Sequence, residues 1–311
     1  MGVSFTHWLK YGFATVLLFA MKAPPRRLAL AAGGAIGGLG WILRLRRKLV
    51  LSNVAQALPA ESEAAVRSIA ARAARNFGRS IVDIVRFSGR DRDRTLDLVR
   101  TRDIEPLQAA LEEGRGAIIV TGHLGAWGLY VASVSRMGIP IALLLRRRRN
   151  PEIDRIIREL PGKHVTMIPH GPLAPRALLR ALKEGKVVVM VADQHGGPRG
   201  IVAPFFGRET STLSLPAALV ARRDVPLFAM TGHRLPDLSH ELSFRRIEVP
   251  AGDGQTEDAR RRQIATLCNQ SISDAVLQYP EQYFWYHRRF RRDGDPSEPA
   301  HLADARPAPE P

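Results

Sequence analysis

A histidine flanked by glycines is the residue of this sequence best placed for acid–base chemistry. His123 follows the apolar run 116–120 and lies between Gly122 and Gly125. An imidazole gains and loses a proton near neutral pH, and glycines leave room for a substrate to approach the backbone. We therefore predict that His123 acts on a proton of a molecule bound at this turn.

Polar side chains follow two further apolar runs. Four arginines, residues 146–149, come directly after run 140–145, and Asp193 with Gln194 follows run 187–191. In an open α/β sheet the site lies beyond the carboxyl ends of the strands, so these side chains are expected to converge near the histidine. Guanidinium groups are planar forks that suit phosphate, which predicts an anionic substrate.

The elements that must position these residues alternate along the chain. Short apolar runs typical of buried strands are separated by stretches with helical periodicity. This alternation predicts an α/β fold with a largely parallel central sheet flanked by helices. The expected strands are residues 116–120, 140–145, 164–168, 187–191, 226–231 and 242–249, and the expected helices are 64–87, 104–113, 173–183, 213–223 and 256–278.

The positive charge is concentrated at the start of the chain. The 311 residues carry a net charge of +16, and residues 1–60 contain eight Lys or Arg but no Asp or Glu. Residues 293–311 are instead acidic and rich in proline, which predicts a disordered tail. This distribution leaves an anionic membrane, a phosphorylated substrate or nucleic acid as the expected partners. Cys268 is the one cysteine, so disulfides are excluded and a reducing compartment is expected.

Two apolar runs, residues 11–21 and 28–43, flank the pair Pro24-Pro25. Each run is shorter than the roughly 20 residues that cross a bilayer, and the prolines break a continuous helix between them. Trp8 and Trp41 lie near the outer ends, where indole rings favour the headgroup layer. We predict that residues 1–45 form membrane-associated helices that either span the bilayer or enter one leaflet, with a pair of core helices as the alternative.

Several blocks of the sequence resemble the late acyltransferases of lipid A biosynthesis (lauroyl and myristoyl transferases) and related lysophospholipid acyltransferases. Residues 121–127, TGHLGAW, resemble the histidine block of that family. The other blocks come in the family's order over about residues 40–292: the basic segment 44–59, Arg146 with 149–151, the pair 193–194, PFFGR at 204–208 and PEQYFWYHRR at 280–289. Because these blocks are ordered, the match is specific, although each block alone is weak.

The resemblance implies a glycerolipid-acyltransferase-like domain over residues 46–292, at the cytoplasmic face of a bacterial inner membrane. Such enzymes move a fatty acyl group from an acyl carrier protein or coenzyme A thioester to a hydroxyl of a phosphorylated lipid, such as a lipid A precursor or a lysolipid. The thioester is a substrate, and neither a cofactor nor a metal is expected. By this likeness His123 is the general base, and the residues expected to contact substrate are Arg146, Arg149, Asn150, Gln194 and Arg208.

The sequence departs from the family at one position that bears on catalysis. The family's histidine is followed four residues later by Asp or Glu, and here that position is Gly128. Asp193, expected at a neighbouring strand end, is predicted to supply the missing carboxylate. The alternative is a protein that binds lipid or carrier protein without turnover.

Two further groups of basic side chains each allow more than one interpretation. Aromatic and basic residues alternate over residues 285–292, where they suit lipid headgroups, an acidic carrier protein or, as a second class of function, stacked bases of nucleic acid. Arg208 follows Gly207 and is either a phosphate or carrier contact or a solvent-exposed turn residue.

Overall fold

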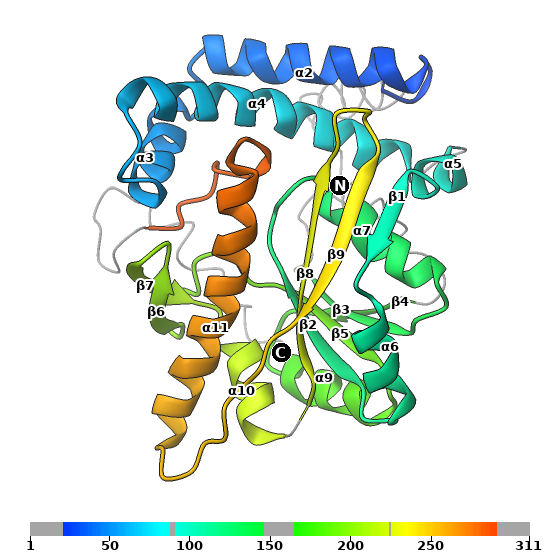
Figure 1. The fold of residues 1–311 in the computed structure, drawn as a ribbon, viewed down its shortest axis with the longest axis vertical. Coiled ribbons are helices and arrows are strands. Elements are labelled where there is room, and N and C mark those ends of the chain that lie inside the picture. Colours follow the sequence, from blue (N-terminus) through cyan, green and yellow to red (C-terminus); the bar gives the residue numbers. More distant parts are fainter. Residues whose placement is uncertain (1–20, 88–90, 146–164, 224, 291–311) are drawn as a thin grey trace, which may run out of the picture.

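A computed structural model describes residues 21–87, 91–145, 165–223 and 225–290. Its elements form a mixed α/β domain (Figure 1). The strands are β1 (Val99–Arg102), β2 (Ala117–Thr121), β3 (Ile141–Leu145), β4 (Val165–Pro169), β5 (Val187–Val191), β6 (Ile201–Phe205), β7 (Arg208–Thr212), β8 (Leu227–Arg234) and β9 (His240–Arg246). The helices are α2 (Arg26–Ile42), α3 (Arg47–Ala57), α4 (Glu63–Arg86), α5 (Arg92–Leu96), α6 (Glu105–Glu112), α7 (Trp127–Arg136), α9 (Ala174–Lys183), α10 (Ser214–Arg222), α11 (Glu257–Gln278) and the 3-10 turn η1 (Pro280–Gln282).

The central sheet has the strand order β1-β9-β8-β2-β5-β3-β4. All neighbouring strands run parallel except β8 and β9, which form an antiparallel hairpin. The prediction of a largely parallel sheet flanked by helices is therefore confirmed. Parallel pairing of Ala117–Thr121 with Val187–Val191 in register brings the ends of β2 and β5 side by side.

The central strands are apolar because both faces of the sheet are covered. Ile118 and Val120 of β2 belong to a core cluster that includes Ile264 and Ile272 of α11. The alternate residue Ile119 packs into the opposite cluster with Leu129 of α7. Successive side chains of a strand point to opposite faces, so a strand between two helical layers has no polar position.

Three strands lie outside the predicted set. β1 is an edge strand with alternating intermediate and exposed residues, so it lacks the apolar run of a buried strand. β6 and β7 form a separate antiparallel hairpin whose turn residues, Phe206 and Gly207, both have positive φ. Glycine adopts that conformation without strain, whereas Phe206 is held there by tertiary packing.

Helix α2 packs along α4 at one end of the molecule (Figure 1). A Cβ atom on Gly78 of α4 would lie 2.0 Å from the carbonyl oxygen of Gly33, and one on Gly37 would lie 2.1 Å from that of Ala74. The two backbones thus touch where neither helix has a side chain. The second apolar run predicted from sequence is this helix, and the first run lies almost wholly outside the described residues.

The outer face of α2 is apolar and exposed. Leu28, Ile36, Leu39 and Ile42 are each at least half exposed, and the helix has no charged residue after Arg27. Among the described residues no single helix is long and apolar enough to cross a membrane, although α2 and α3, bent by 96° to one another, reach that length and composition as a pair.

We predict that Gly78→Ala lowers the free energy of unfolding by about 1–3 kcal/mol, because the added methyl group overpacks the contact with Gly33. Chemical unfolding in mild detergent measures this. Gly40→Ala is the matched control: its Cβ would meet only Leu45, at 3.6 Å, and alanine favours helix by up to about 1 kcal/mol. Equal stability of the Gly78 variant and the wild type would contradict the backbone contact.

Candidate active site

His123 and Asp193 meet at the carboxyl ends of the adjacent strands β2 and β5. Each lies two residues beyond a paired residue, Thr121 in β2 and Val191 in β5. The Asp193 Oδ1 atom is 2.8 Å from His123 Nδ1, and the backbone N–H of His123 donates to Asp193 Oδ2, also at 2.8 Å. The carboxylate therefore holds the ring and the backbone of the same residue, and it contacts the ring at Nδ1 and not at Nε2.

Asp193 is ionised although its side chain is only 2% exposed. Burial alone would raise the pKa of Asp193, but the charge of His123, its two hydrogen bonds and one from the Tyr283 hydroxyl lower that pKa to about 2. Because the folded-state pKa lies below the ordinary value, the pairing stabilises the fold at neutral pH and loses this contribution as the pH falls towards 2. Asp193 is thus a permanent carboxylate at the pH of the cell.

The chain's closing block, residues 280–289, pairs with the histidine turn. The backbone N–H of Phe284 donates to the carbonyl of His123 at 3.0 Å, and that of Gly125 donates to Gln282 at 3.0 Å. Leu124 and Tyr283 form an antiparallel bridge between these hydrogen bonds. Two segments about 160 residues apart in sequence are thus joined by antiparallel backbone hydrogen bonds beside His123.

Aromatic rings and one amide surround the imidazole. Trp127 meets it edge to face with ring centroids 4.8 Å apart, and Phe284 lies at 5.8 Å. The Gln194 side-chain amide is 3.4 Å from His123 Nε2. The side chain of His123 is 13% exposed, so Nε2 faces a restricted and largely apolar approach.

The glycines beside His123 have a different role from the one predicted. A Cβ on Gly122 would lie 2.9 Å from Ile272 and 3.4 Å from Asp193 Oδ2. Gly125 has φ +58°, and a Cβ there would lie 2.4 Å from the Tyr130 hydroxyl. The room they provide is filled by the protein's own side chains, which support the turn, so the prediction that they admit a substrate is wrong.

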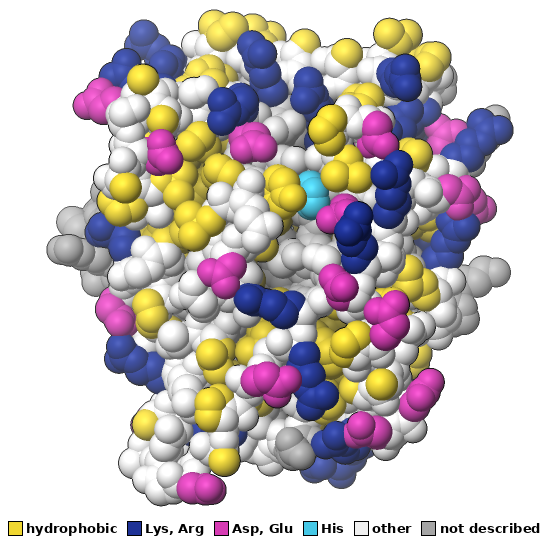
Figure 2. Space-filling model, in the orientation of Figure 1, with side chains coloured by type: hydrophobic (Ala, Val, Ile, Leu, Met, Phe, Trp, Pro, Cys, Tyr) yellow, Lys and Arg dark blue, Asp and Glu magenta, His cyan; other side chains and the backbone are white. Residues whose placement is uncertain are grey.

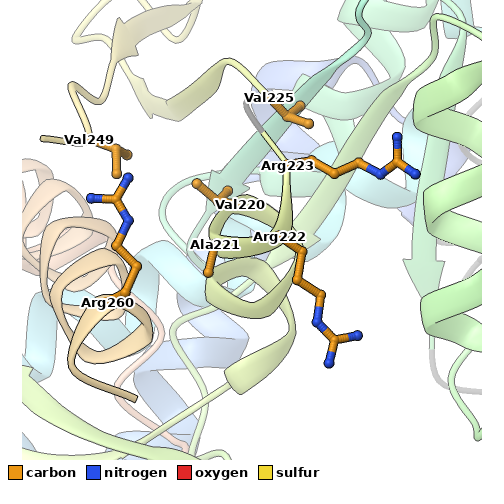
Figure 3. A pocket seen from close by; sticks show the side chains of 7 residues that line it. All are labelled: Val220, Ala221, Arg222, Arg223, Val225, Val249 and Arg260. Atoms are coloured by element: carbon orange, nitrogen blue, oxygen red, sulfur yellow. The ribbon is translucent and has the colours of Figure 1, made fainter. Parts of the chain in front are cut away.

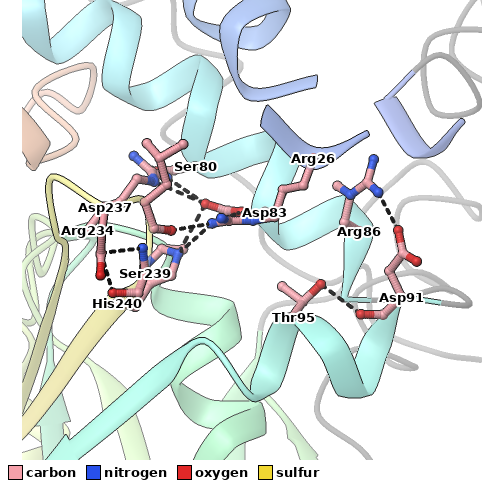
Figure 4. A network of polar contacts seen from close by, with 12 residues as sticks. Arg26, Ser80, Asp83, Arg86, Asp91, Thr95, Arg234, Asp237, Ser239 and His240 are labelled. Atoms are coloured by element: carbon pink, nitrogen blue, oxygen red, sulfur yellow. Dashed lines mark hydrogen bonds and ion pairs between the residues drawn. The ribbon is translucent and has the colours of Figure 1, made fainter. Parts of the chain in front are cut away.

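A buried polar network supports the far side of the same turn (Figure 4). The Tyr130 hydroxyl accepts from the backbone N–H of Ala126 and lies 3.1 Å from His240 Nδ1, while His240 Nε2 is 3.2 Å from Asp83 Oδ2. Arg26 and Arg234 each pair with the fully buried Asp83, at 2.8 Å. Burial would raise the pKa of Asp83, but the hydrogen bond from His240 and the charge of Arg234 keep it well below its usual range. The network joins α2, α4, α7, β8 and β9.

Within the described part of the aromatic and basic cluster, residues 285–290, two side chains are buried. Trp285 and Arg289 are each 2% exposed. The Arg289 guanidinium donates to Thr212 Oγ1 and lies over the ring of Phe205. Burial lowers the pKa of His287 to about 4, so this ring is neutral at pH 7. The prediction that these side chains bind headgroups, carrier protein or bases is therefore wrong for Trp285 and Arg289; Arg291 and Arg292 lie outside the described residues.

Three of the other predicted site residues, Arg146, Arg149 and Asn150, lie outside the described residues. Arg208 is exposed at the start of β7, a position that both readings of this residue allow. Tyr283, which donates a hydrogen bond to Asp193, is not among the residues predicted from the sequence. Its contact depends on how the closing block folds onto the histidine turn, and its place in a block shared with the family was the only signal in the sequence.

A cavity of about 240 Å³ lies near the amino end of β8, beside α10 (Figure 3). It is lined by apolar residues of α10 and by the guanidinium groups of Arg222, Arg223 and Arg260. Val225, also in the lining, precedes the start of β8, whereas His123 follows the end of the parallel strand β2. The cavity therefore does not adjoin the histidine.

Residues 3–292 match the family described as bacterial lipid A biosynthesis acyltransferase. The chain belongs to this family. It is therefore an acyltransferase, an enzyme that uses an acyl donor and a lipid acceptor. This assignment replaces the nucleic-acid alternative. The resemblance stated from the ordered sequence blocks is confirmed.

Three curated relatives give the range of the similarity. The lipid A biosynthesis palmitoleoyltransferase of Escherichia coli (strain K12) is 24% identical over 289 residues, 92% of each chain. The lipid A biosynthesis lauroyltransferase of the same strain is 26% identical over 306 residues, 94% of each chain. The phosphatidylinositol mannoside acyltransferase of Mycolicibacterium smegmatis is 25% identical over 157 residues, 49% of this chain and 52% of its own.

Gly128, where the acyltransferases of this family carry an acid by the resemblance, faces an apolar surface of α4 here. A Cβ at this position would lie 3.7 Å from Ile84 and 3.8 Å from Phe87. The nitrogen of His123 that such an acid orients is already bonded to Asp193. A carboxylate introduced at position 128 would therefore lie against apolar side chains, and the imidazole N–H that it could bind already contacts Asp193.

We predict that Gly128→Asp gives no gain in acyl transfer and lowers the free energy of unfolding by about 1–3 kcal/mol, because the carboxylate is desolvated against Ile84 and Phe87. Gly128→Ala is the control, since a methyl group fits the same contacts at ordinary distances. Thermal unfolding and turnover of the two variants are compared. Faster turnover in the aspartate variant alone would show that His123 lacks an effective carboxylate.

Proposed function

We propose that this protein is a membrane-associated O-acyltransferase in which His123 is the general base and Asp193 its orienting carboxylate. The observation that carries the proposal is the 2.8 Å contact between Asp193 Oδ1 and His123 Nδ1. A carboxylate on Nδ1 fixes the proton there and makes Nε2, which the Gln194 amide nitrogen approaches at 3.4 Å, the atom that accepts a proton. Tyr283 supports the pair by donating to the same carboxylate.

The reaction follows from that tautomer. His123 Nε2 removes the proton of the acceptor hydroxyl as its oxygen attacks the carbonyl carbon of an acyl thioester. The C–S bond then breaks, the new ester forms, and the imidazolium returns its proton to the departing thiolate. Asp193 stabilises the imidazolium between these steps. The amide of Gln194, 3.4 Å from Nε2, is placed to hydrogen-bond a reacting group.

The substrates are proposed from the family and from the site. The donor is an acyl thioester of carrier protein or coenzyme A, and the acceptor is a hydroxyl of a phosphorylated lipid such as a lipid A precursor or a lysolipid. The relatives named above act on lipid A precursors or on phosphatidylinositol mannoside, which supports a glycolipid or phospholipid acceptor. Trp127 and Phe284 supply an apolar wall suited to an acyl chain.

Membrane association is proposed through the exposed face of α2, at the cytoplasmic face of the inner membrane. Apolar residues recur on this face at helical spacing from Leu28 to Ile42, Arg26 and Arg27 begin the helix, and Arg44 follows its end. Helices of this kind lie in the interfacial plane with the apolar face among acyl chains. The opposite face of α2 is already packed on α4, so the outer face is the one left to contact lipid.

We predict that His123→Ala and Asp193→Asn each lower kcat by about 10²- to 10⁴-fold, because both remove the oriented base. The measurement is thiol release from an acyl thioester in the presence of a lysolipid in detergent. His287→Gln is the control, since it changes a neighbouring buried histidine that lies outside the proposed proton path.

Two outcomes would contradict this assignment. If the wild type releases no thiol above background under any acceptor tested, the chain is a binding member of the family that has lost turnover. If Asp193→Asn keeps wild-type turnover while His123→Ala loses it, another group orients the imidazole.

We predict that replacing both Leu39 and Ile42 with Glu lowers partitioning into phospholipid vesicles by at least about tenfold, since each side chain loses apolar contact with the bilayer. Vesicle flotation measures the bound fraction. Leu173 and Val202 are 77% and 52% exposed, and replacing both with Glu is the matched control. Equal losses in the two double variants would show that α2 has no special role in membrane contact.

A further inference from the structure

Two arginines of α4 pack against two glycines on the side of α2. A Cβ on Gly34 would lie 3.0 Å from Arg79 Nε, and a Cβ on Gly38 would lie 3.3 Å from Arg75 Nε. Both glycines and both arginines are four residues apart, one helical turn, so the pairs repeat along the two helices. The arginine stems therefore lie across α2, with their charged ends beside it.

These arginines are a concentration of positive charge. The Arg79 side chain is half-buried, and its pKa is lowered by that burial and by the charges of Arg234 and Arg75. The Arg79 guanidinium donates a hydrogen bond of 3.4 Å to Asn76 Oδ1. Among the described residues no carboxylate forms an ion pair with Arg75 or Arg79, in contrast to Arg26 and Arg234, which share Asp83. Neighbouring like charges without a counter-ion are stabilised by an anion.

The position of the pair suggests which anion. Figure 2 shows hydrophobic side chains along the outer edge formed by α2 and basic side chains just beneath it. For a helix lying in the bilayer surface, its flank is at the depth of the lipid phosphates, while its outer face reaches the acyl layer. Arginines that extend beside such a helix keep their stems on apolar surface and their guanidinium groups at the headgroups.

We propose that Arg75 and Arg79, seated over Gly38 and Gly34, form a binding site for the phosphate of an anionic membrane lipid. Two guanidinium groups one turn apart present several N–H donors in planar forks, which match phosphate oxygens. The glycines let the arginine stems lie close to α2, because a Cβ atom on either would press on the stem at 3.0–3.3 Å.

The site adjoins the His123 region through the same helix. Asn76, between the two arginines, donates to the carbonyl of Glu281, and Phe77 packs on Phe284, whose ring neighbours His123. If the proposed acyl transfer holds, a lipid bound by its phosphate here lies with its headgroup region towards the histidine. This orientation rests on the proposed acyl transfer, and the choice of a lipid phosphate rests on the proposed membrane contact of α2.

The test is binding of the full chain to vesicles of equal parts phosphatidylcholine and phosphatidylglycerol. We expect the double variant Arg75→Gln/Arg79→Gln to partition about 25-fold more weakly than the wild type, from about 1 kcal/mol for each cation at an anionic surface. On pure phosphatidylcholine, where the net surface charge is zero, the difference should shrink to a few-fold.

Two further variants separate a site from general charge. Arg176→Gln/Arg180→Gln removes two exposed arginines of α9 with the same four-residue spacing, and we expect a loss of twofold or less. Arg75→Lys/Arg79→Lys keeps the charge but lacks the planar fork, so we expect it to recover only part of the binding. Circular dichroism and thermal unfolding identify any variant that fails to fold, and in that case the single variants are measured.

The outcomes are distinct. An equal loss in the α4 and α9 variants, or full recovery with lysine, would overturn the site and leave only long-range attraction. Binding of inorganic phosphate in solution that is lost in the double variant, while vesicle partitioning stays at the wild-type level, would show a free-anion site and overturn the lipid assignment. Vesicle binding is measured without turnover, so loss of acyl transfer in His123→Ala with normal binding bears on the proposed function alone.

Discussion

The buried charge of Asp193 is the constraint on which the site depends. An ionised carboxylate that is 2% exposed is stable only with close partners, and here these are the ring and backbone of His123 and the hydroxyl of Tyr283. Loss of a partner from such a buried pair costs about 3–5 kcal/mol. The adjacency of β2 and β5 and the pairing of the closing block with the histidine turn both serve this requirement, so fold stability and imidazole orientation have the same origin.

Helix α4 links that site to the surface that we assign to lipid. Its residues Asn76 and Phe77 contact the closing block, Asp83 anchors the buried network that reaches Tyr130, and Gly78 admits the backbone of α2. Arg26 of α2 shares Asp83 with Arg234 of β8, which ties the N-terminal helix to the sheet. The surface proposed for lipid at α2 and the His123 site are therefore joined by one continuous set of packed elements.

The parts of the fold predicted from sequence are those with a local signal. β2, β3 and β5 are apolar runs because helices cover both faces, and the turns after them carry polar residues because strands end at the sheet edge. The edge strand β1 and the β6–β7 hairpin have no such run, since an edge strand is partly solvated and a short hairpin is held by its neighbours. The sequence did not predict the burial of Trp285 and Arg289, because a basic segment has the same local pattern whether it lies in solvent or in a polar interior.

The sequence by itself determined the fold class, the family and the identity of the two central residues, because periodicity and short motifs are local properties of the chain. It also showed that position 128 has no acid. Only the tertiary structure decided that the Asp193 carboxylate contacts the His123 ring, since residues 123 and 193 become neighbours through strand order. It likewise decided that the glycines beside His123 make room for protein side chains and that two arginines of α4 lie over glycines of α2. Close approach between distant segments depends on how backbones pack, and no local pattern encodes it.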